Sequence, residues 1–399
     1  VLKRHRAENT ANVYALIQQL MDAYMPVARK ELTELAHLAK KLCGEDFQLE
    51  PWDYSYFGRK LKMERYNLDA EMLRPYFKLE NVKKGVFGLA TRLYGITFHL
   101  RKDIPVYHPD VEAYEVLDED GTYLGVLYAD FHPRENKQSG AWMTSYAEQY
   151  IDQDGKDHRP HVSITMNLTK PTEDKPSLLT LGEVETFLHE FGHALHGLFS
   201  RVRFMAQSGT NVYRDFVELP SQFMENYVTQ KEFLDTFAVH YETDAPLPEE
   251  LIKRVKDSNN YMCGYLCIRQ LSFCMLDMAY YDMKEPFTED VPAFEAKAWE
   301  KAQLLPQPPQ TCMSVQFGHI MNGGYSAGYY SYKWAEVLDA DAFSLFLQNG
   351  IFDRQTASRF RHEVLERGGT EQPMRLYERF RGQKPTIDAL LKRNGISKA

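Results

Sequence analysis

A mainly α-helical fold with a small β-sheet is predicted for this chain of 399 residues. Apolar residues recur at helical spacing through most of the sequence, whereas alternation of apolar and polar residues is confined to residues 101–170. A hydrophobic content of 44% with 26% charged residues is typical of a globular protein with a sizeable core. We therefore expect helices to form the body of the protein and an antiparallel or mixed sheet to lie beside one of them.

Helices are expected where an amphipathic pattern lies between residues that start and stop helices. The first covers residues 9–42 as one or two long helices, because Pro26 can kink or break it. The other predicted helices are Ser55–Tyr66, Leu79–Leu93, Leu178–Leu198, Val217–Gln230, Pro248–Tyr281, Ala293–Leu304, Tyr325–Leu347, Arg354–Arg367, Glu371–Phe380 and Thr386–Arg393.

Strands are predicted in one part of the chain only. They are Ala113–Asp118, Thr122–Ala129, Ala141–Thr144 and Val162–Leu168. The first two alternate on either side of Glu119-Asp120-Gly121, which is a typical hairpin turn. We expect the other two strands to complete a small sheet around this hairpin.

The most informative motif is His189-Glu190-Phe191-Gly192-His193. Residues four apart lie on the same face of a helix, so both imidazoles can reach one metal ion, and Glu190 can act as a base beside it. Thr180 and Glu183 form a capping box ahead of an apolar stripe, which places the motif in a partly buried helix. Unpaired histidine and glutamate would be costly there, so a metal site is favoured over a solvated helix rich in these residues.

A catalytic zinc ion needs three protein ligands and one open position. His196 lies three residues after His193 on a similar face, but a supporting role near the ligands is the commoner fate of such a histidine. The remaining source is a glutamate from a following helix. Glu218 and Glu225 are seven residues apart and share a face, so one can bind the metal while the other supports an imidazole. Periodicity alone leaves this choice open.

Two sequence blocks together resemble the thimet oligopeptidase family of zinc peptidases. The first is the His189–His193 motif followed by Asp215-Phe216-Val217-Glu218-Leu219-Pro220-Ser221-Gln222, and the second runs from Phe317 to Trp334. The interval from His319 to Tyr325 has one residue more than in mammalian thimet oligopeptidase and is similar to the bacterial peptidyl-dipeptidase (dipeptidyl carboxypeptidase) branch. The resemblance extends more weakly over nearly the whole chain.

This resemblance implies a zincin-like helical metallopeptidase domain that binds one Zn²⁺ per chain. It assigns Glu218 as the third ligand beside His189 and His193, and leaves Glu225 and His196 to support the ligands. Members of the family carry an additional N-terminal segment, so we expect this chain to correspond to the C-terminal catalytic part. Residues 1–399 are then one catalytic domain, with a helical part at 1–100, the sheet at 101–170 and a helical zinc- and substrate-binding part at 171–399.

The second block contains three tyrosines at helical spacing, Tyr325, Tyr329 and Tyr332. Without other context, such tyrosines more often form an aromatic core stripe. Peptide hydrolysis, however, generates a tetrahedral oxyanion, and a donor aimed at that oxygen is worth about 3–4 kcal/mol of barrier. The resemblance implies that His319, Tyr325 and Tyr332 are these donors and that Tyr329, Gly323 and Gly324 contact the substrate.

The expected activity is therefore zinc-dependent hydrolysis of short peptides. Glu190 would accept the proton of the attacking water and pass it to the leaving amine. The extra residue before Tyr325 favours release of C-terminal dipeptides over internal cleavage by an oligopeptidase. A peptide-binding protein that retains the zinc site is the alternative from another class, and Glu190 argues against it because a binder needs no base.

Two features of substrate binding are expected. Zinc peptidases commonly hold an extended peptide along a sheet edge, which here is Gly140–Thr144 or Val162–Met166. Release of dipeptides also requires a cationic or donor group that grips the substrate carboxylate. The candidates are Arg201, Arg203, Arg214 and Lys333.

Composition bounds the remaining partners. The net charge of −9 and the lack of a long basic run argue against nucleic acid. The most hydrophobic region, Tyr261–Tyr281, is interrupted by Arg269, Gln270 and Asp277, so a buried helix is expected and not a membrane span. A monomer in the cytoplasm is the simplest expectation, since cysteines without disulfides fit a reducing compartment. The five cysteines expected to be free are Cys43, Cys263, Cys267, Cys274 and Cys312.

Overall fold

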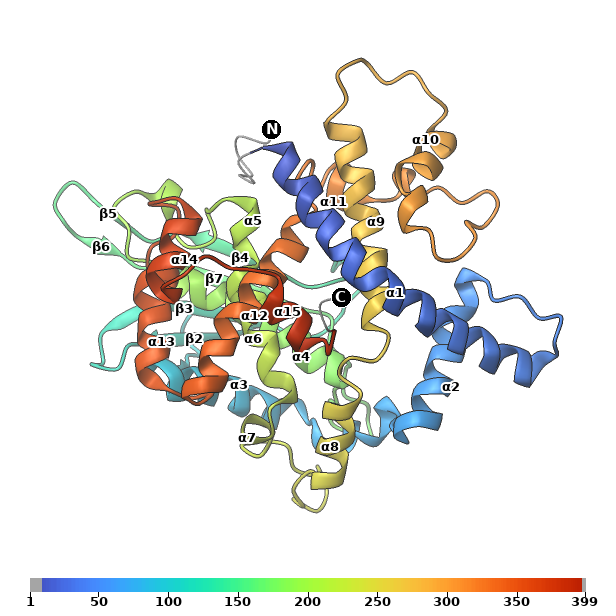
Figure 1. The fold of residues 1–399 in the computed structure, drawn as a ribbon. Coiled ribbons are helices and arrows are strands. Elements are labelled where there is room, and N and C mark those ends of the chain that lie inside the picture. The colour runs from blue at the N-terminus through green and yellow to red at the C-terminus, as the bar shows by residue number, and fades with distance from the viewer. Residues whose placement is uncertain (1–8, 397–399) are drawn as a thin grey trace.

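The computed structural model describes residues 9–396 and confirms a mainly α-helical fold with a small mixed sheet (Figure 1). The α-helices are α1 (Thr10–Cys43), α2 (Tyr54–Tyr66), α3 (Leu79–Tyr94), α4 (Leu181–Leu198), α5 (Arg214–Val217), α6 (Leu219–Glu225), α7 (Lys231–Leu234), α8 (Glu249–Asp257), α9 (Cys263–Tyr281), α10 (Val291–Ala298), α11 (Gly318–Met321), α12 (Ser331–Asn349), α13 (Arg354–Phe360), α14 (Pro373–Arg381) and α15 (Asp388–Arg393). The strands are β1 (Thr97–Leu100), β2 (Glu112–Leu117), β3 (Tyr123–Asp130), β4 (Trp142–Ala147), β5 (Tyr150–Ile151), β6 (Asp157–His158) and β7 (His161–Thr165).

The main sheet has the strand order β1-β2-β3-β7-β4. The predicted hairpin is β2–β3, β7 pairs parallel to β3, and β4 pairs antiparallel to β7. Strand β4 is therefore an edge, as expected for Gly140–Thr144, whereas the alternative edge Val162–Met166 is wrong because β7 is paired on both sides. Strand β1 forms the other edge and was not predicted, since it lies in the part expected to be helical.

Helix α1 is one continuous helix that passes through Pro26. The side chain of Asn9 accepts a hydrogen bond from the amide of Asn12 at 3.0 Å and so caps the helix. Helix α1 packs along α9 over much of its length (Figure 1). This helix pair forms one side of the molecule, the sheet forms the other, and helices α4, α6 and α12 lie between them (Figure 1).

Two predicted helices are divided in the structure, and a third begins later than predicted. Val217–Gln230 is divided at Glu218 into the end of α5 and the start of α6, followed by a 3₁₀ turn, because Pro220 has no amide hydrogen and takes a place in the first turn of α6. Pro248–Tyr281 is divided by a turn in which Met262 has φ 58°, so α8 and α9 are separate. Tyr325–Leu347 becomes helical only at Ser331.

Two apolar cores support the candidate site. The sheet core packs the sheet against α3, α4, α6 and the C-terminal helices, and it includes Leu127, Ile164, Phe187, Phe223 and Phe343. The α1–α9 core packs α1, α9 and α12 together, and it includes Leu20, Tyr24, Ile268, Leu271 and Val337.

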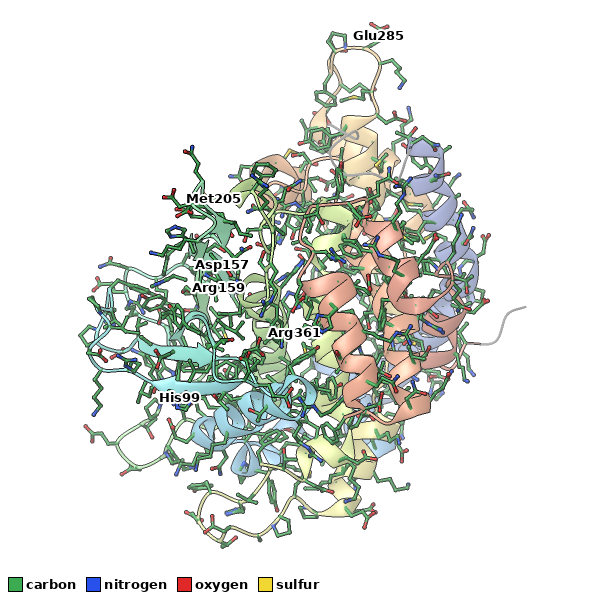
Figure 2. The ribbon with its side chains drawn as sticks, turned by 90° about the vertical axis from the view of Figure 1, so that its left-hand side faces the viewer. His99, Asp157, Arg159, Met205, Glu285 and Arg361 are labelled. Atoms are coloured by element: carbon green, nitrogen blue, oxygen red, sulfur yellow. The ribbon has the colours of Figure 1, made fainter. Side chains whose placement is uncertain are left out.

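Charged residues also connect the C-terminal helices to the sheet. Arg361 lies where these two parts meet, and its Nη1 donates to Asp118 Oδ1 at 2.8 Å (Figure 2). At the top of the view in Figure 2, the loop that carries Glu285 projects beyond the end of α9. Within residues 9–396, no helix combines the length and the apolar character that crossing a membrane requires.

Candidate metal and catalytic site

Helix α4 holds the His189–His193 motif in a fixed position. Its start is the predicted capping box: Glu183 N donates to Thr180 Oγ1 at 3.1 Å, and Thr180 N donates to Glu183 Oε2 at 2.8 Å. The helix packs on β3, β4 and β7 on one side and on α6 on another. Every residue from Glu190 to Ser200 is buried, so the second half of the helix is surrounded by protein.

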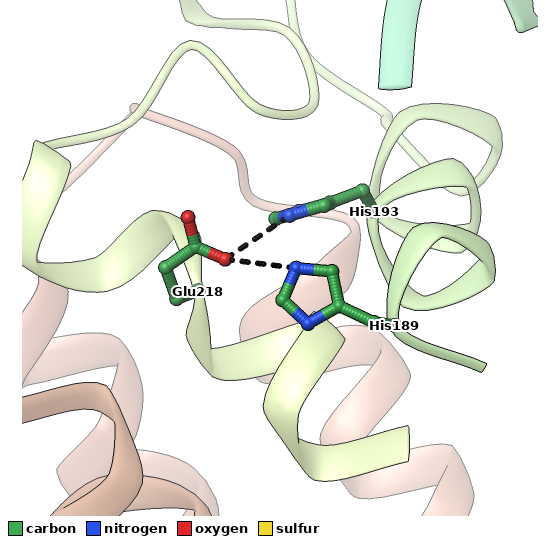
Figure 3. A group of neighbouring side chains, drawn as sticks. All are labelled: His189, His193 and Glu218. Atoms are coloured by element: carbon green, nitrogen blue, oxygen red, sulfur yellow. Dashed lines mark ion pairs between the residues drawn. The ribbon is translucent and has the colours of Figure 1, made fainter. Parts of the chain in front are cut away.

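Gly192 lets α6 approach this helix closely. A Cβ atom at Gly192 would lie 2.4 Å from the carbonyl oxygen of Pro220, which no side chain tolerates. The close approach places Glu218, at the junction of α5 and α6, opposite the two imidazoles (Figure 3). The glycine in the motif is therefore explained by packing, since the chemistry does not require it.

The three predicted ligands converge (Figure 3). Oε2 of Glu218 lies 3.3 Å from Nε2 of His189 and 3.1 Å from Nε2 of His193. One ligand atom from each residue lies within 4.8 Å of the others. Tetrahedral zinc with bonds of about 2.0–2.1 Å separates its ligand atoms by about 3.3 Å. The residues therefore fit a zinc ion by both spacing and donor chemistry.

Glu218 is held from several directions and is only 3% exposed. Its Oε2 accepts a hydrogen bond from Ser221 Oγ at 2.9 Å, and its Oε1 accepts one from Tyr325 Oη at 2.5 Å. Burial alone would raise the pKa of Glu218, but the charges and hydrogen bonds of His193 and His189 hold that pKa well below its ordinary value. Glu218 is thus a buried anion aimed at the two imidazoles, an arrangement that attracts a cation.

Glu225 and His196 were both predicted to support the ligands. Glu225 Oε1 lies 2.5 Å from Nδ1 of His189, so it can fix the ring with Nε2 facing Glu218. His196 is fully buried, and neither of its ring nitrogens has a hydrogen-bond partner among residues 9–396. Burial and the neighbouring His193 lower the pKa of His196 to about 3, which keeps the ring neutral. The structure therefore shows a supporting contact for Glu225 and no such hydrogen bond for His196.

Glu190 is suited to accept a proton. It is 4% exposed, and its Oε2 has no hydrogen-bond partner among the described residues. Burial raises the pKa of Glu190, although His193 and His189 partly oppose the shift. A buried carboxylate with a free oxygen and a raised pKa has the properties of a general base.

The tyrosines come together on a segment that is mostly not helical. Tyr325 and Tyr329 lie in turns before α12, so the predicted helical spacing does not describe them. Their rings nevertheless gather around Tyr332, with centroid distances of 4.9 Å from Tyr325 and 5.3 Å from Tyr329. His319 is exposed, and its ring centroid lies 6.0 Å from that of Tyr325. We call residues 318–332 the tyrosine segment.

The predicted substrate contacts within this segment differ from one another. Tyr329 is 7% exposed, and its hydroxyl donates to Gln270 Oε1 at 3.0 Å, so it braces Tyr332 and does not face open space. Gly323 and Gly324 are exposed. Gly324 has φ 85°, a left-handed conformation that favours glycine.

Among the four candidate cations, Arg214 lies at the site. Its guanidinium is 4.8 Å from the ring centroid of Tyr325, and no ion-pair partner is found for it within residues 9–396. Lys333 is buried and paired with Glu336, and Arg201 Nη2 donates to Asp118 Oδ2 at 3.2 Å. The Arg203 guanidinium lies 6.0 Å from the ring centroid of Phe204.

Sequence reasoning missed three residues that support the site: Ser221, Gln270 and Asp277. Ser221 stands within the block that follows the histidine motif, but spacing gave no reason to pair it with Glu218. Gln270 and Asp277 were noted only as polar interruptions of a hydrophobic helix. A buried carboxylate in such a helix was itself a signal, because it must have hydrogen-bond partners.

Comparison with known proteins identifies the family. The model of Peptidase family M3 matches residues 1–396. The chain belongs to Peptidase family M3. It is 42% identical over 393 residues to Oligopeptidase A of Escherichia coli (strain K12), covering 98% of this chain and 58% of that protein. It is 38% identical over 398 residues to the Dipeptidyl carboxypeptidase of the same organism, again covering 98% of this chain and 58% of the relative. These matches confirm the resemblance.

The chain thus spans less than two thirds of the length of these curated relatives. Two solved structures share the fold. PZ peptidase A with an inhibitor has a TM-score of 0.53 at 14% identity, covering 98% of this chain and 58% of that one. An M32 carboxypeptidase from Deinococcus radiodurans R1 has a TM-score of 0.51 at 16% identity, covering 98% and 80%. These likenesses confirm a helical zincin-like fold.

Proposed function

We propose that this chain carries the zinc site of a peptidase that hydrolyses short peptides. The observation that carries the proposal is the convergence of His189, His193 and Glu218. The buried carboxylate of Glu190, whose Oε2 has no hydrogen-bond partner among residues 9–396, comes from the same turn of helix. Membership in Peptidase family M3 supports it. A protein that only bound peptides would have no use for a buried base beside the metal ligands.

Each residue has a distinct role in this proposal. Zinc, when bound, acts as a Lewis acid and lowers the pKa of a coordinated water. Glu190 accepts a proton from the attacking water and passes it to the leaving amine. Tyr325 and Tyr332 remain protonated, because burial and then the charge of Glu218 raise the pKa of both hydroxyls. They can therefore donate, together with His319, to the oxyanion that develops on the substrate carbonyl.

We further propose that the peptidase releases C-terminal dipeptides. Arg214 supports this, because its guanidinium lies against Tyr325 and close to Gly324 and has no ion-pair partner among residues 9–396. A guanidinium can bind a peptide carboxylate through two hydrogen bonds. Strand β4, the sheet edge that contacts α4, would pair with the backbone of the extended substrate.

Internal cleavage of short peptides is the second candidate. Its support is the 42% identity to Oligopeptidase A, against 38% to Dipeptidyl carboxypeptidase. Both activities would use the same zinc ligands and the same base. They differ in whether the substrate must present a free carboxylate.

Mass spectrometry of products from peptides of five to twelve residues, with free or amidated C-termini, separates the candidates. Stepwise loss of dipeptides from free C-termini, blocked by amidation, supports dipeptide release. Arg214→Gln should then raise KM for the free peptides, because the partner of their carboxylate is lost. Internal cuts that ignore amidation would instead support the oligopeptidase. Absence of cleavage by the zinc-loaded protein, with tight peptide binding, would favour the binding protein.

The cytoplasmic location and the monomeric state stay predictions from the sequence. Light scattering of the purified protein tests the second, with a mass of 46.4 kDa expected for one chain. Fractionation of the native cells tests the first.

A further inference from the structure

One face of α9 holds the tyrosine segment in place. Gln270, Asp277 and Tyr281 follow one another at intervals of seven and four residues, so they project from the same side of the helix. Gln270 Oε1 accepts a hydrogen bond from the Tyr329 hydroxyl, and the Tyr281 hydroxyl donates to the carbonyl of Ile320 at 2.5 Å. Asp277 lies between these two contacts and binds the backbone of the segment itself.

The contacts of Asp277 concentrate on one turn. Its Oδ1 accepts from the amide of Ala327 at 2.8 Å, and its Oδ2 accepts from the amide of Tyr329 at 2.9 Å. Asp277 is 0% exposed and lies among the apolar residues of the α1–α9 core. An anion buried in this way is costly unless hydrogen bonds compensate for the water it has lost. The backbone amides of the tyrosine segment supply part of that compensation, and burial still raises the pKa of Asp277 to about 7.

The turn that Asp277 binds has an unfavourable conformation. Ala327 has φ 56°, a left-handed conformation that is strained for a residue with a Cβ atom. This turn separates Tyr325 from Tyr329 and Tyr332, so its conformation decides how the rings meet. Losing the carboxylate would let the turn relax and would move the tyrosine hydroxyls away from the zinc ligands.

We propose that Asp277 is a positioning residue for the tyrosine donors of the reaction. Its two hydrogen bonds go to the amides of Ala327 and Tyr329, so it acts through the backbone of residues 327–329. This inference rests on the proposed peptidase function. Its distinctive consequence is a loss of kcat with little change in KM or in zinc binding, because binding groups stay in place while transition-state donors are displaced.

Asp277→Asn is the central variant, and Glu31→Gln is its matched control. Glu31 is also a buried carboxylate that accepts two backbone amides, from Gly264 at 3.1 Å and Tyr265 at 2.7 Å, but at the far end of α9. We expect Asp277→Asn to lower kcat by about 10- to 100-fold, since donors displaced by about 1 Å lose that much. KM and bound zinc should stay within about twofold, and Glu31→Gln should leave kcat within about twofold.

Coupling to the tyrosines distinguishes positioning from general destabilisation. In a Tyr325→Phe, Tyr332→Phe background, Asp277→Asn should lower kcat by less than about threefold, because the donors it positions are already gone. Ala327→Gly should restore part of the kcat of Asp277→Asn, since glycine adopts φ 56° without strain. An equal loss of kcat in both backgrounds, or no rescue by glycine, would overturn the proposal.

Hydrogen exchange of backbone amides in the wild-type protein tests the role of Asp277 without an activity assay and without any substituted protein. The amides of Ala327 and Tyr329 should exchange as slowly as those of Gly264 and Tyr265, which have the same kind of partner. Exchange as fast as in the surface loop 305–311 would show that Asp277 does not hold the turn. If the zinc-loaded wild type cleaves no peptide, the proposed function fails while this measurement still decides the role of Asp277.

Discussion

His193 and Glu218 belong to helices that pack inside the sheet core, whereas His319 and Tyr325 lie on a segment with little regular structure beside the α1–α9 core. The candidate metal ligands are held by short contacts, including those of Glu218 with Ser221 and of His189 with Glu225. The tyrosine segment contains exposed glycines and depends on α9 for its anchoring. We call the candidate ligands with their contacts the ligand wall, and the tyrosine segment the donor wall. The difference teaches that packing within its own core holds the ligand wall, whereas the donor wall takes its position from the neighbouring helix α9.

The largest expected effect comes from Glu190→Gln, which alters the base and leaves all three ligands in place. Hydrolysis should fall by about 10³-fold, because proton transfer to and from the substrate is lost. Zinc content, measured by atomic absorption, should be unchanged. A parallel loss of zinc would mean that Glu190 helps to hold the metal as part of the ligand wall and does not act as the base.

Tyr325→Phe tests the donor wall. We expect kcat to fall by about 10²-fold with a small change in KM, because a donor to the oxyanion is removed. Tyr325 also donates to Glu218, so zinc affinity measured by chelator competition serves as the second reading. Equal losses of kcat and of zinc affinity would contradict a separation between the two walls.

Glu225→Gln sharpens the comparison from the ligand side. Removing a partner of a ligating imidazole typically weakens metal binding by about 10- to 100-fold, so chelator competition should show a weaker site. Glu363→Gln is the control. Glu363 accepts a hydrogen bond from Arg379 in an exposed ion pair, and neither residue is near the metal ligands in the sequence. No change in zinc affinity would mean that the contact with His189 Nδ1 at 2.5 Å does not orient the ring.

The smallest effect concerns packing beneath the ligands. Gly192→Ala should destabilise the fold by about 1–3 kcal/mol, since the added methyl group meets the Pro220 carbonyl. Gly182→Ala, in the same helix, adds a methyl group whose Cβ comes no closer than 4.0 Å to Thr180 and should be neutral or stabilising. Thermal unfolding monitored by circular dichroism compares the two, and equal shifts would show that α4 and α6 need not approach closely.

Much of the fold followed from periodicity and caps. The hairpin β2–β3 and the capping box at Thr180 are local features, so the sequence predicted them directly. The break at Glu218 was missed because Pro220 was accepted within the first turn of one longer helix. The break at Met262 was missed because nothing in the local sequence marks a methionine with φ 58°. Strand β1 was missed because four residues are too few for a clear alternation.

The candidate site divides in the same way. The pair His189 and His193 could be read from helical spacing, whereas the choice between Glu218 and Glu225 needed the family resemblance. Their positions on opposite nitrogens of His189 depend on how α6 crosses α4, which no single segment encodes. The anchoring of the tyrosine segment by Asp277 is a contact across 50 residues and has no local signature.

The burial of Glu190–Ser200, which covers the second half of α4 and the two residues after it, limits which substitutions this stretch can accept. A helix on a protein surface keeps roughly one face where substitutions are neutral, but this stretch has none. This stretch holds the candidate ligand His193 and residues that fill the core. It also holds two glycines without room for a side chain: Gly192 faces the backbone of Pro220, and Gly197 faces the side chains of Val162 and Met143. A saturation scan of the chain should therefore show eleven adjacent positions, 190–200, as one uninterrupted band of intolerance.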